Sequence, residues 1–504
     1  MLAFLALGAW SLSSPVGSSP DDDFHLASIW CGLGERPGLC ENPNDDPVKR
    51  YVPAPVHDAT CFAFHPEESA ACWNPEASGM VEVDRANADG LYPPVFYGAM
   101  SLFASTNIAA SVMAMKLVNC ALAVGSLTLT FFWLPRRLRP ALVVSVVATA
   151  VPLGMFIYGS TNPSAWAFLS AAIVWTTALG ALQTSGRQRV VLSALLLFGV
   201  IIGAGARADA AVYAVFGVLL AALLGWRARR DQLPAVILAV VAIGLSVAFY
   251  LSAWQGSSIV DGLDTERGPL TVAQHLSNLL AAPTLWMGAL GGWGLGWLDT
   301  SMPAAVSVLA GAVLWGAVFI GLRHVDVRRG IAVTASIAAM WLVPVVLLGR
   351  SRMMVGELIQ PRYLVPLMII TVGVASYRWN AARAWRGMRL ILAAAALTIA
   401  NIIALHINIQ RYTTGTDRLS TDPGRDAEWW WAYAPSPMVV WVGGSLAFAG
   451  LFVALWFALP RTDDDRVTFD GAPSLDTPEP PDDGSGAASN KRSAASTGVV
   501  LPAT

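Results

Sequence analysis

Charge is scarce in this chain of 504 residues. Asp, Glu, Lys and Arg make up 13% of it and hydrophobic residues 55%, whereas soluble domains carry about 25% charged residues. The apolar residues come in long blocks, many near the ~20 residues that a helix needs to cross a bilayer. A net charge of −2 creates no overall attraction to nucleic acid. The composition predicts an all-α integral membrane protein without a nucleic-acid partner.

Several common catalytic motifs are also absent. The sequence contains no Gly-x-x-x-x-Gly-Lys-Ser/Thr phosphate loop, no Gly-x-Ser-x-Gly nucleophile elbow and no His-Glu-x-x-His zinc motif. The N-terminus lacks the basic start and small-residue cleavage site of a secretory signal. We therefore interpret residues 1–14 as a first transmembrane helix, which is either a partial span or the end of one that starts upstream.

The other hydrophobic blocks predict eleven further spans, so that the protein has about twelve transmembrane helices. These blocks lie at 106–134, 141–158, 164–182, 190–204, 210–226, 235–254, 302–321, 331–349, 363–377, 390–409 and 438–459.

The basic residues of the loops predict the orientation. Five loops on one side hold 15 Lys/Arg in 43 residues, whereas the opposite loops hold 12 in about 178 residues. Basic loops stay in the cytoplasm. We therefore expect the long loops, including 15–105 with an interfacial helix, to be extracytoplasmic, and both termini of this cell-membrane protein to be cytoplasmic. The polytopic domain covers 106–460, and 461–504, rich in Asp, Pro, Ser, Gly and Ala, is a predicted disordered cytoplasmic tail.

Four of the five cysteines lie in the first outer loop. An even number of cysteines in an oxidising compartment indicates two disulfides. Of the three possible pairings we favour the local one, Cys31–Cys40 with Cys61–Cys72. Free thiols or a zinc site are the alternatives, although no Cys-x-x-Cys spacing occurs.

Three consecutive carboxylates, Asp21, Asp22 and Asp23, follow the first span. Cations that face them come from distant spans. Lys116 lies about ten residues inside a predicted helix, where a charge indicates a functional site, and snorkelling is the alternative. Arg207 can form a local ion pair with Asp209 or bind an anion.

Arginine is a natural partner of phosphate because its planar guanidinium donates two hydrogen bonds at once. Arg362 opens a predicted span, where ion pairing with a carboxylate is the alternative role. Carboxylates and arginines on the outer face suit sugar transfer from a lipid-phosphate donor, in which a carboxylate takes the proton of the acceptor and arginine holds the departing phosphate. We predict that Arg362, Lys116, Arg207 and Gln360 bind this donor phosphate. The predicted substrate pocket comprises His25, Tyr92, Asn162, His275, Trp297, Asp299 and Tyr363.

Several motifs carry a resemblance to a known family. They are Pro20-Asp21-Asp22-x-x-His25, Tyr92-Pro93-Pro94, Asn162-Pro163-Ser164, Gly296-Trp297-Leu298-Asp299 and Gln360-x-Arg362-Tyr363-x-x-Pro366. The ordered set, over about 1–460, resembles a bacterial family of membrane proteins, the domain of unknown function 2142, whose first motif is Pro-Asp-Glu-x-x-His.

That family in turn resembles the GT-C glycosyltransferases. The resemblance implies an inverting sugar transfer from a polyprenyl-phosphate donor to a cell-envelope glycan or lipid, with a catalytic acid residue in the first outer loop. Asp21 matches the family Asp by position. Asp22 stands where Glu is usual and Asp23 replaces a common Pro, so the identity of the base stays open among the three. Some GT-C enzymes hold a divalent cation with such carboxylates, which Asp21 and Asp22 would permit.

Two other classes of function compete with an enzyme. A transporter or flippase of lipid-linked glycans would also use an intramembrane Lys116, although no internal repeat typical of transporters is found. In a non-catalytic subunit of an envelope assembly, Asp21–Asp23 would only be a polar loop surface.

Overall fold

The computed structural model describes residues 1–458 except 44, 257–266, 324, 358 and 378–380. The predicted tail at 461–504 lies outside the described residues. The predicted membrane fold is confirmed: among the described residues, nine helices are long and apolar enough to cross a bilayer, and three apolar helices are shorter. Together they correspond to the twelve predicted blocks.

The long candidate spans are α5 (Ile108–Trp133), α8 (Ser164–Gln183), α9 (Gly186–Ala204), α10 (Ala208–Gly225), α11 (Leu233–Leu251), α15 (Ala304–Gly321), α16 (Val327–Arg350), α19 (Met388–Thr413) and α20 (Pro437–Ala458). The shorter apolar helices are α1 (Leu2–Leu12), α6 (Arg139–Ala148) and α17 (Val365–Ser376). The block predicted at 141–158 divides into α6 and α7 (Leu153–Tyr158). Pro152 lies at the break, and its ring removes the N–H that a continuous helix needs.

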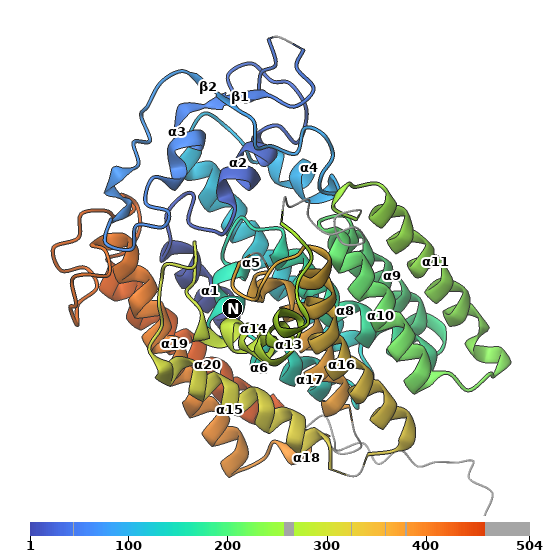
Figure 1. The fold of residues 1–504 in the computed structure, drawn as a ribbon. Coiled ribbons are helices and arrows are strands. Elements are labelled where there is room, and N and C mark those ends of the chain that lie inside the picture. The colour runs from blue at the N-terminus through green and yellow to red at the C-terminus, as the bar shows by residue number, and fades with distance from the viewer. Residues whose placement is uncertain (44, 257–266, 324, 358, 378–380, 459–504) are drawn as a thin grey trace, which may run out of the picture. The chain divides into compact units, whose positions relative to one another are not determined.

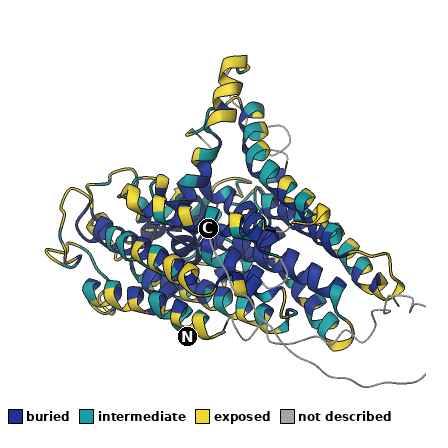
Figure 2. Ribbon diagram, turned by 90° about the horizontal axis from the view of Figure 1, so that it is seen from below, coloured by how far each residue is buried: buried dark blue, intermediate teal, exposed yellow. Residues whose placement is uncertain are grey.

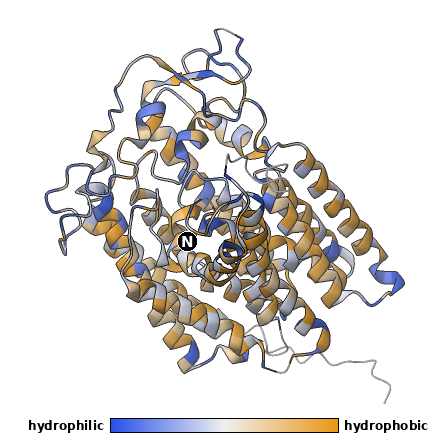
Figure 3. Cartoon of the chain, viewed as in Figure 1, coloured by the Kyte–Doolittle hydropathy of each residue, from blue (hydrophilic) through white to orange (hydrophobic). Residues whose placement is uncertain are grey.

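The helices pack around α8, which is buried over its whole hydrophobic stretch. It contacts α9, α10 and α17, whereas α1 packs between α5 and α20 (Figure 1). Helix α11 is mostly exposed, as expected of a helix whose apolar faces meet lipid. Figure 2 shows the buried residues on the inner sides of the helices, and Figure 3 shows that the helices are hydrophobic along most of their length.

The first long loop folds into a separate layer at one end of the helices (Figure 1). It contains α2 (Asp22–Trp30), α3 (Ala54–His57), α4 (Val95–Ser101) and an antiparallel pair of strands, β1 (Arg50–Pro53) and β2 (Met80–Val83). Arg50 pairs with Val83 and Pro53 with Met80. Both predicted disulfides, Cys31–Cys40 and Cys61–Cys72, are confirmed.

Arg411 near the end of α19 joins this layer to the helices. Its Nη2 donates to the carbonyl oxygens of Phe62 at 2.8 Å and His65 at 3.1 Å and to Asp299 Oδ2 at 2.8 Å, and its Nη1 donates to the carbonyl oxygen of Glu68. These carbonyls belong to the loop closed by Cys61–Cys72. One buried cation therefore holds a disulfide loop against a transmembrane helix.

The described part of the loop at 255–300 is partly helical. It contains α13 (Val272–Ala281) and α14 (Pro283–Met287). Helix α13 begins with a capping box, in which Thr271 and Gln274 each accept a backbone N–H from the other. A short helix, α18 (Ala381–Ala384), precedes α19.

Candidate functional site

The three consecutive aspartates lie in three different environments because the chain turns sharply at the first of them. Asp21 is the residue before α2 and adopts a left-handed conformation with φ 60°, which Asp tolerates better than most residues. Its carbonyl oxygen accepts from the backbone N–H of His25 at 2.8 Å. The turn leaves the side chain of Asp21 30% exposed, while Asp22 is 1% exposed.

Asp22 is a buried anchor. Its Oδ2 accepts from the backbone N–H of Ser19 at 3.0 Å, and its Oδ1 accepts from the hydroxyl of Thr161 at 3.1 Å. Burial, despite these bonds, raises the pKa of Asp22 to about 7. Next to Thr161, the amide of Asn162 donates to the carbonyl oxygen of Pro20 at 2.9 Å. The polar turn after α7 thus holds the acidic motif in place. Thr161 bonds to the Asp22 side chain, and Asn162 bonds to the backbone of Pro20.

Asp21 forms an ion pair with Arg362, which lies in the short turn Pro361–Tyr363 before α17. Burial raises the pKa of Asp21 more than any single neighbour lowers it, but the lowering contributions, led by the charge of Arg362 and its hydrogen bond, together outweigh burial, so the pKa lies below its ordinary value. The Nη2 of Arg362 also donates to the Tyr363 hydroxyl at 3.1 Å. Its Nε and Nη1 are buried and have no hydrogen-bond partner among the described residues. Such donors are costly to bury unless a ligand satisfies them.

A second buried arginine shares this property. Arg207, between α9 and α10, binds Asp209 through two hydrogen bonds of 2.8 and 3.0 Å. Its guanidinium carbon lies 4.9 Å from the ring centre of Tyr363 and 5.7 Å from that of Tyr92. Its Nη1 has no partner in the described part of the chain. The predicted local pair with Asp209 is therefore present, and one donor is left over.

Asp21 and Arg207 line a cavity of about 370 Å³, within the usual range of small-molecule sites. Arg362 is not part of the lining and lies behind Asp21 and Tyr363. The polar lining includes Asp21, Arg207, Tyr92, Tyr363 and Gln360, all of them predicted site residues. An apolar wall comes from Val212 of α10 and from Val343 and Leu347 of α16. These two helices are candidate spans, so the apolar wall lies among the transmembrane helices. The same cavity therefore has both a polar and an apolar part.

Behind this lining, His25 lies in an aromatic cluster. Its Nδ1 is 2.9 Å from the hydroxyl of Tyr97 on α4, and its Nε2 is buried without a partner among the described residues. Burial lowers the pKa of His25 to about 3, so the ring is neutral at neutral pH. Burial likewise raises the pKa of Tyr92 to about 12, and this phenol keeps its proton.

Arg85 is a lining residue that the sequence did not indicate. It follows β2, forms an ion pair with Asp23 and lines the cavity. Burial raises the pKa of Asp23 despite this partner. A single Arg in a polar loop of more than eighty residues has no local signal. Only the folding of the first loop over α2 brings Arg85 to the site.

Other predicted site residues do not line this cavity. The Nζ of Lys116 donates to the carbonyl oxygens of Ser14 at 2.7 Å and Pro15 at 3.0 Å, and so satisfies backbone groups that follow α1. Asp299 pairs with Arg411. Trp297 Nε1 donates to the carbonyl oxygen of Gly17 at 2.9 Å, and His275 is exposed on α13. Their roles in binding stay predictions.

The carboxylates do not fit a metal site. Asp21 is paired with Arg362, and both oxygens of Asp22 accept hydrogen bonds. Within the described ranges, no three His, Cys, Asp or Glu side chains are grouped as a metal ion would require. We therefore derive no chemical step through a divalent cation.

Comparison with known proteins gives one family. Residues 4–371 match the family described as "Predicted membrane protein (DUF2142)", which confirms the resemblance seen in the motifs. No curated protein matches the chain. A solved structure similar to it is that of ArnT from Cupriavidus metallidurans bound to undecaprenyl phosphate, with 14% sequence identity and a TM-score of 0.39, covering 91% of this chain and 77% of that chain. So distant a similarity supports no argument about this chain.

Proposed function

Because this chain belongs to the DUF2142 family of predicted membrane proteins, and because of the cavity beside Asp21, we propose that it is a membrane glycosyltransferase. It transfers a sugar from a polyprenyl-phosphate donor to a glycan or lipid of the cell envelope, on the outer face of the membrane. The observation that carries the proposal is the joint presence of an accessible carboxylate, Asp21, and two buried arginines with unpaired donors, Arg207 and Arg362.

The donor is held by its phosphate. An arginine donor that is buried and unpaired in the free protein gains a strong charge-assisted bond when a phosphate oxygen arrives. Arg207 lines the cavity, and Arg362 lies directly behind Asp21 and Tyr363. The apolar wall from α10 and α16 suits the hydrocarbon tail of a lipid donor, which no soluble nucleotide sugar would need.

In the proposed reaction Asp21 takes the proton of an acceptor hydroxyl. The acceptor oxygen attacks the anomeric carbon from the face opposite the phosphate, and the bond between that carbon and the phosphate oxygen breaks. The electron pair leaves with polyprenyl phosphate, whose developing charge the two arginines stabilise. The attack from the opposite face inverts the configuration.

Asp21 and the donor phosphate compete for Arg362, and this competition explains how a carboxylate with a lowered pKa becomes a useful base. In the free protein the charge of Arg362 stabilises the ionised form of Asp21 and thereby weakens it as a proton acceptor. A donor phosphate that shares Arg362 draws part of this interaction away. The basicity of Asp21 then rises when the donor is present.

The test uses purified protein, a set of radiolabelled polyprenyl-phosphate sugars and cell-envelope acceptors. We expect Asp21→Asn to lower transfer by about 10²–10⁴-fold, the usual contribution of a general base. Asp58→Asn, at an exposed aspartate of the same loop, is the matched control and should keep full activity. Unchanged thermal unfolding of both variants would show that they fold.

The same preparation separates the competing functions. If no donor is used, but labelled lipid-linked glycan crosses the bilayer of reconstituted vesicles, the protein is a flippase. If Asp21→Asn transfers sugar as fast as the unchanged protein while Asp23→Asn does not, the base is Asp23 and the assignment of Asp21 is wrong.

A further inference from the structure

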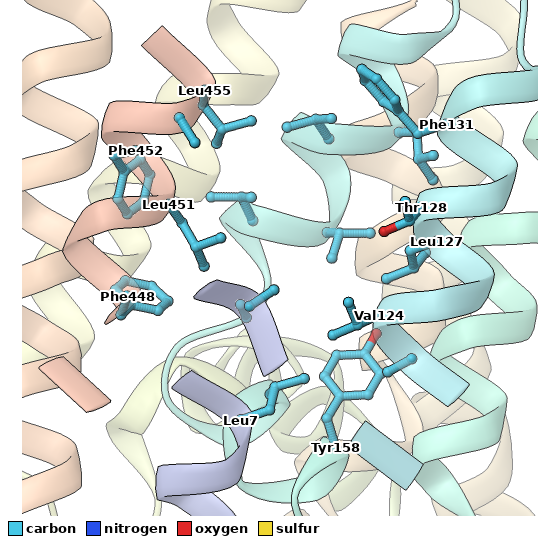
Figure 4. A pocket seen from close by; sticks show the side chains of 18 of the residues that line it. Leu7, Val124, Leu127, Thr128, Phe131, Tyr158, Phe448, Leu451, Phe452 and Leu455 are labelled. Atoms are coloured by element: carbon cyan, nitrogen blue, oxygen red, sulfur yellow. The ribbon is translucent and has the colours of Figure 1, made fainter. Parts of the chain in front are cut away.

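A second cavity lies among the hydrophobic helices, and none of the three aspartates lines it. Its volume is about 370 Å³, and α1, α5, α6, α7 and α20 form its walls. The lining is apolar except for the hydroxyls of Thr128 and Tyr158. In Figure 4, Phe131 and Leu455 lie at one end of the cavity and Leu7 and Tyr158 at the other.

The cavity has the length and chemistry of a hydrocarbon chain. Its lining on α5 runs from Ala123 to Phe132, which is about 14 Å at 1.5 Å per residue. All of its walls belong to the predicted transmembrane blocks, so lipid is the medium around it. The hydrocarbon of lipid is therefore the molecule that can fill the cavity. Water would have few hydrogen-bond partners in it.

One end of the cavity lies beside a basic turn. The turn at 134–138 joins α5 to α6, and it contains Arg136 and Arg137, both exposed. Arg139, the first residue of α6, lies 5.2 Å from the ring centre of the lining residue Phe131, and its Nη2 donates to the carbonyl oxygen of Phe132 at 2.8 Å. The segment 134–140 contains no acidic residue. Basic clusters between transmembrane helices attract anionic head groups.

We propose that this cavity binds one acyl chain of an anionic phospholipid, whose phosphate lies at the basic turn beside Arg136 and Arg137. The site is separate from the proposed donor site, because it uses the second half of α5 and the first half of α1, whereas the aspartates follow the C-terminal end of α1. Its deep end is Tyr158, whose hydroxyl has no partner among the described residues. Three residues later, Thr161 bonds to Asp22. The lipid thus packs against the segment that supports the acidic motif.

The test is native mass spectrometry of delipidated protein after addition of phosphatidylglycerol or phosphatidylcholine. We expect one tightly retained phosphatidylglycerol and several-fold weaker retention of phosphatidylcholine. Val146→Trp fills the cavity and should abolish retention. Ala454→Phe fills it from α20 if the first variant fails to fold. Val240→Trp, on the exposed face of α11, is the matched control and should retain the lipid.

The charge at the mouth is tested separately. Each of Arg136→Gln and Arg137→Gln should weaken phosphatidylglycerol retention by about fivefold and leave phosphatidylcholine unaffected. Equal retention of both lipids by the unchanged protein would overturn the anionic assignment. Full retention by the folded Val146→Trp and Ala454→Phe variants would overturn the site itself. Neither outcome depends on glycosyl transfer.

Discussion

Two buried Arg–Asp pairs in this protein look alike in isolation and differ in what surrounds them. Arg411 and Asp299 are both almost fully buried, and Arg411 also donates to three backbone carbonyls. Arg362 is equally buried, but Asp21 is 30% exposed and lines a cavity. Two nitrogens of Arg362 are unpaired among the described residues, against one of Arg411.

The difference teaches how to separate a structural ion pair from a functional one. A buried charge contributes to a stable fold when the protein itself supplies its partners, as the carbonyls at 62, 65 and 68 do for Arg411. A buried cation that keeps spare donors beside a cavity is poised for an anion that the protein does not contain. Burial of the arginine does not discriminate between the two cases, whereas unpaired donors that lie beside a cavity do.

The largest expected effect is on stability, at the Arg411–Asp299 pair. Arg411→Gln should lower the free energy of unfolding by about 3–5 kcal/mol, because it leaves Asp299 buried without its cation. Thermal unfolding in detergent measures the loss. Arg418→Gln removes an arginine from an exposed pair with Glu428 and should cost at most about 1 kcal/mol. Equal losses in the two variants would contradict the structural role of Arg411.

Substitution in the Arg362–Asp21 pair should affect activity more than stability. Arg362→Gln is expected to lower glycosyl transfer by about 10²–10³-fold, as the loss of one charge-stabilising donor does in other enzymes. Its unfolding temperature should change less than that of Arg411→Gln, because Asp21 can still reach solvent. Initial rates at saturating donor, with unfolding recorded on the same samples, give both quantities. A variant that unfolds easily and transfers normally when folded would reverse the comparison.

The disulfides sharpen the comparison further. Removing Cys61–Cys72 by double Ser substitution should cost about 3 kcal/mol, and so should removing Cys31–Cys40, because the closed loops are of similar length. Only the loop closed by Cys61–Cys72 carries the carbonyls that Arg411 binds. The cost of losing Cys61–Cys72 should therefore be non-additive with Arg411→Gln in a double-mutant cycle, whereas that of Cys31–Cys40 should be additive.

The smallest expected effect is a displacement of the pH profile. The charge of Arg362 lowers the pKa of Asp21, and a general base works only when ionised. The rate in the unchanged protein should therefore persist to low pH and fall as the pH passes down through this pKa. Arg362→Gln removes the lowering charge, so the acid limb of kcat/KM, which reports the free protein, should move to higher pH. Arg362→Lys keeps a charge and should move it less, and an unmoved limb in Arg362→Gln would exclude Asp21 as the base.

Much of the framework could be read from the chain. The twelve hydrophobic blocks correspond to nine long and three short apolar helices in the described part, because crossing a bilayer imposes length and apolarity on contiguous residues. The local disulfide pairing was also predictable, since cysteines nine and eleven residues apart need only a local turn to meet. Of the predicted site residues, those at 21, 92, 207, 360 and 363 line one cavity.

The remaining assignments required the fold. Sequence adjacency made Asp21, Asp22 and Asp23 equivalent candidates, and the left-handed turn at Asp21 sends them to a cavity, to Thr161 and to Arg85. An intramembrane charge such as Lys116 looked functional, yet its ammonium group meets the carbonyls that follow α1. The periodicity and composition of a segment indicate whether lipid or water surrounds it, and this depends only on local sequence. Partners more than a hundred residues away are chosen by packing, and only the tertiary structure contains that choice.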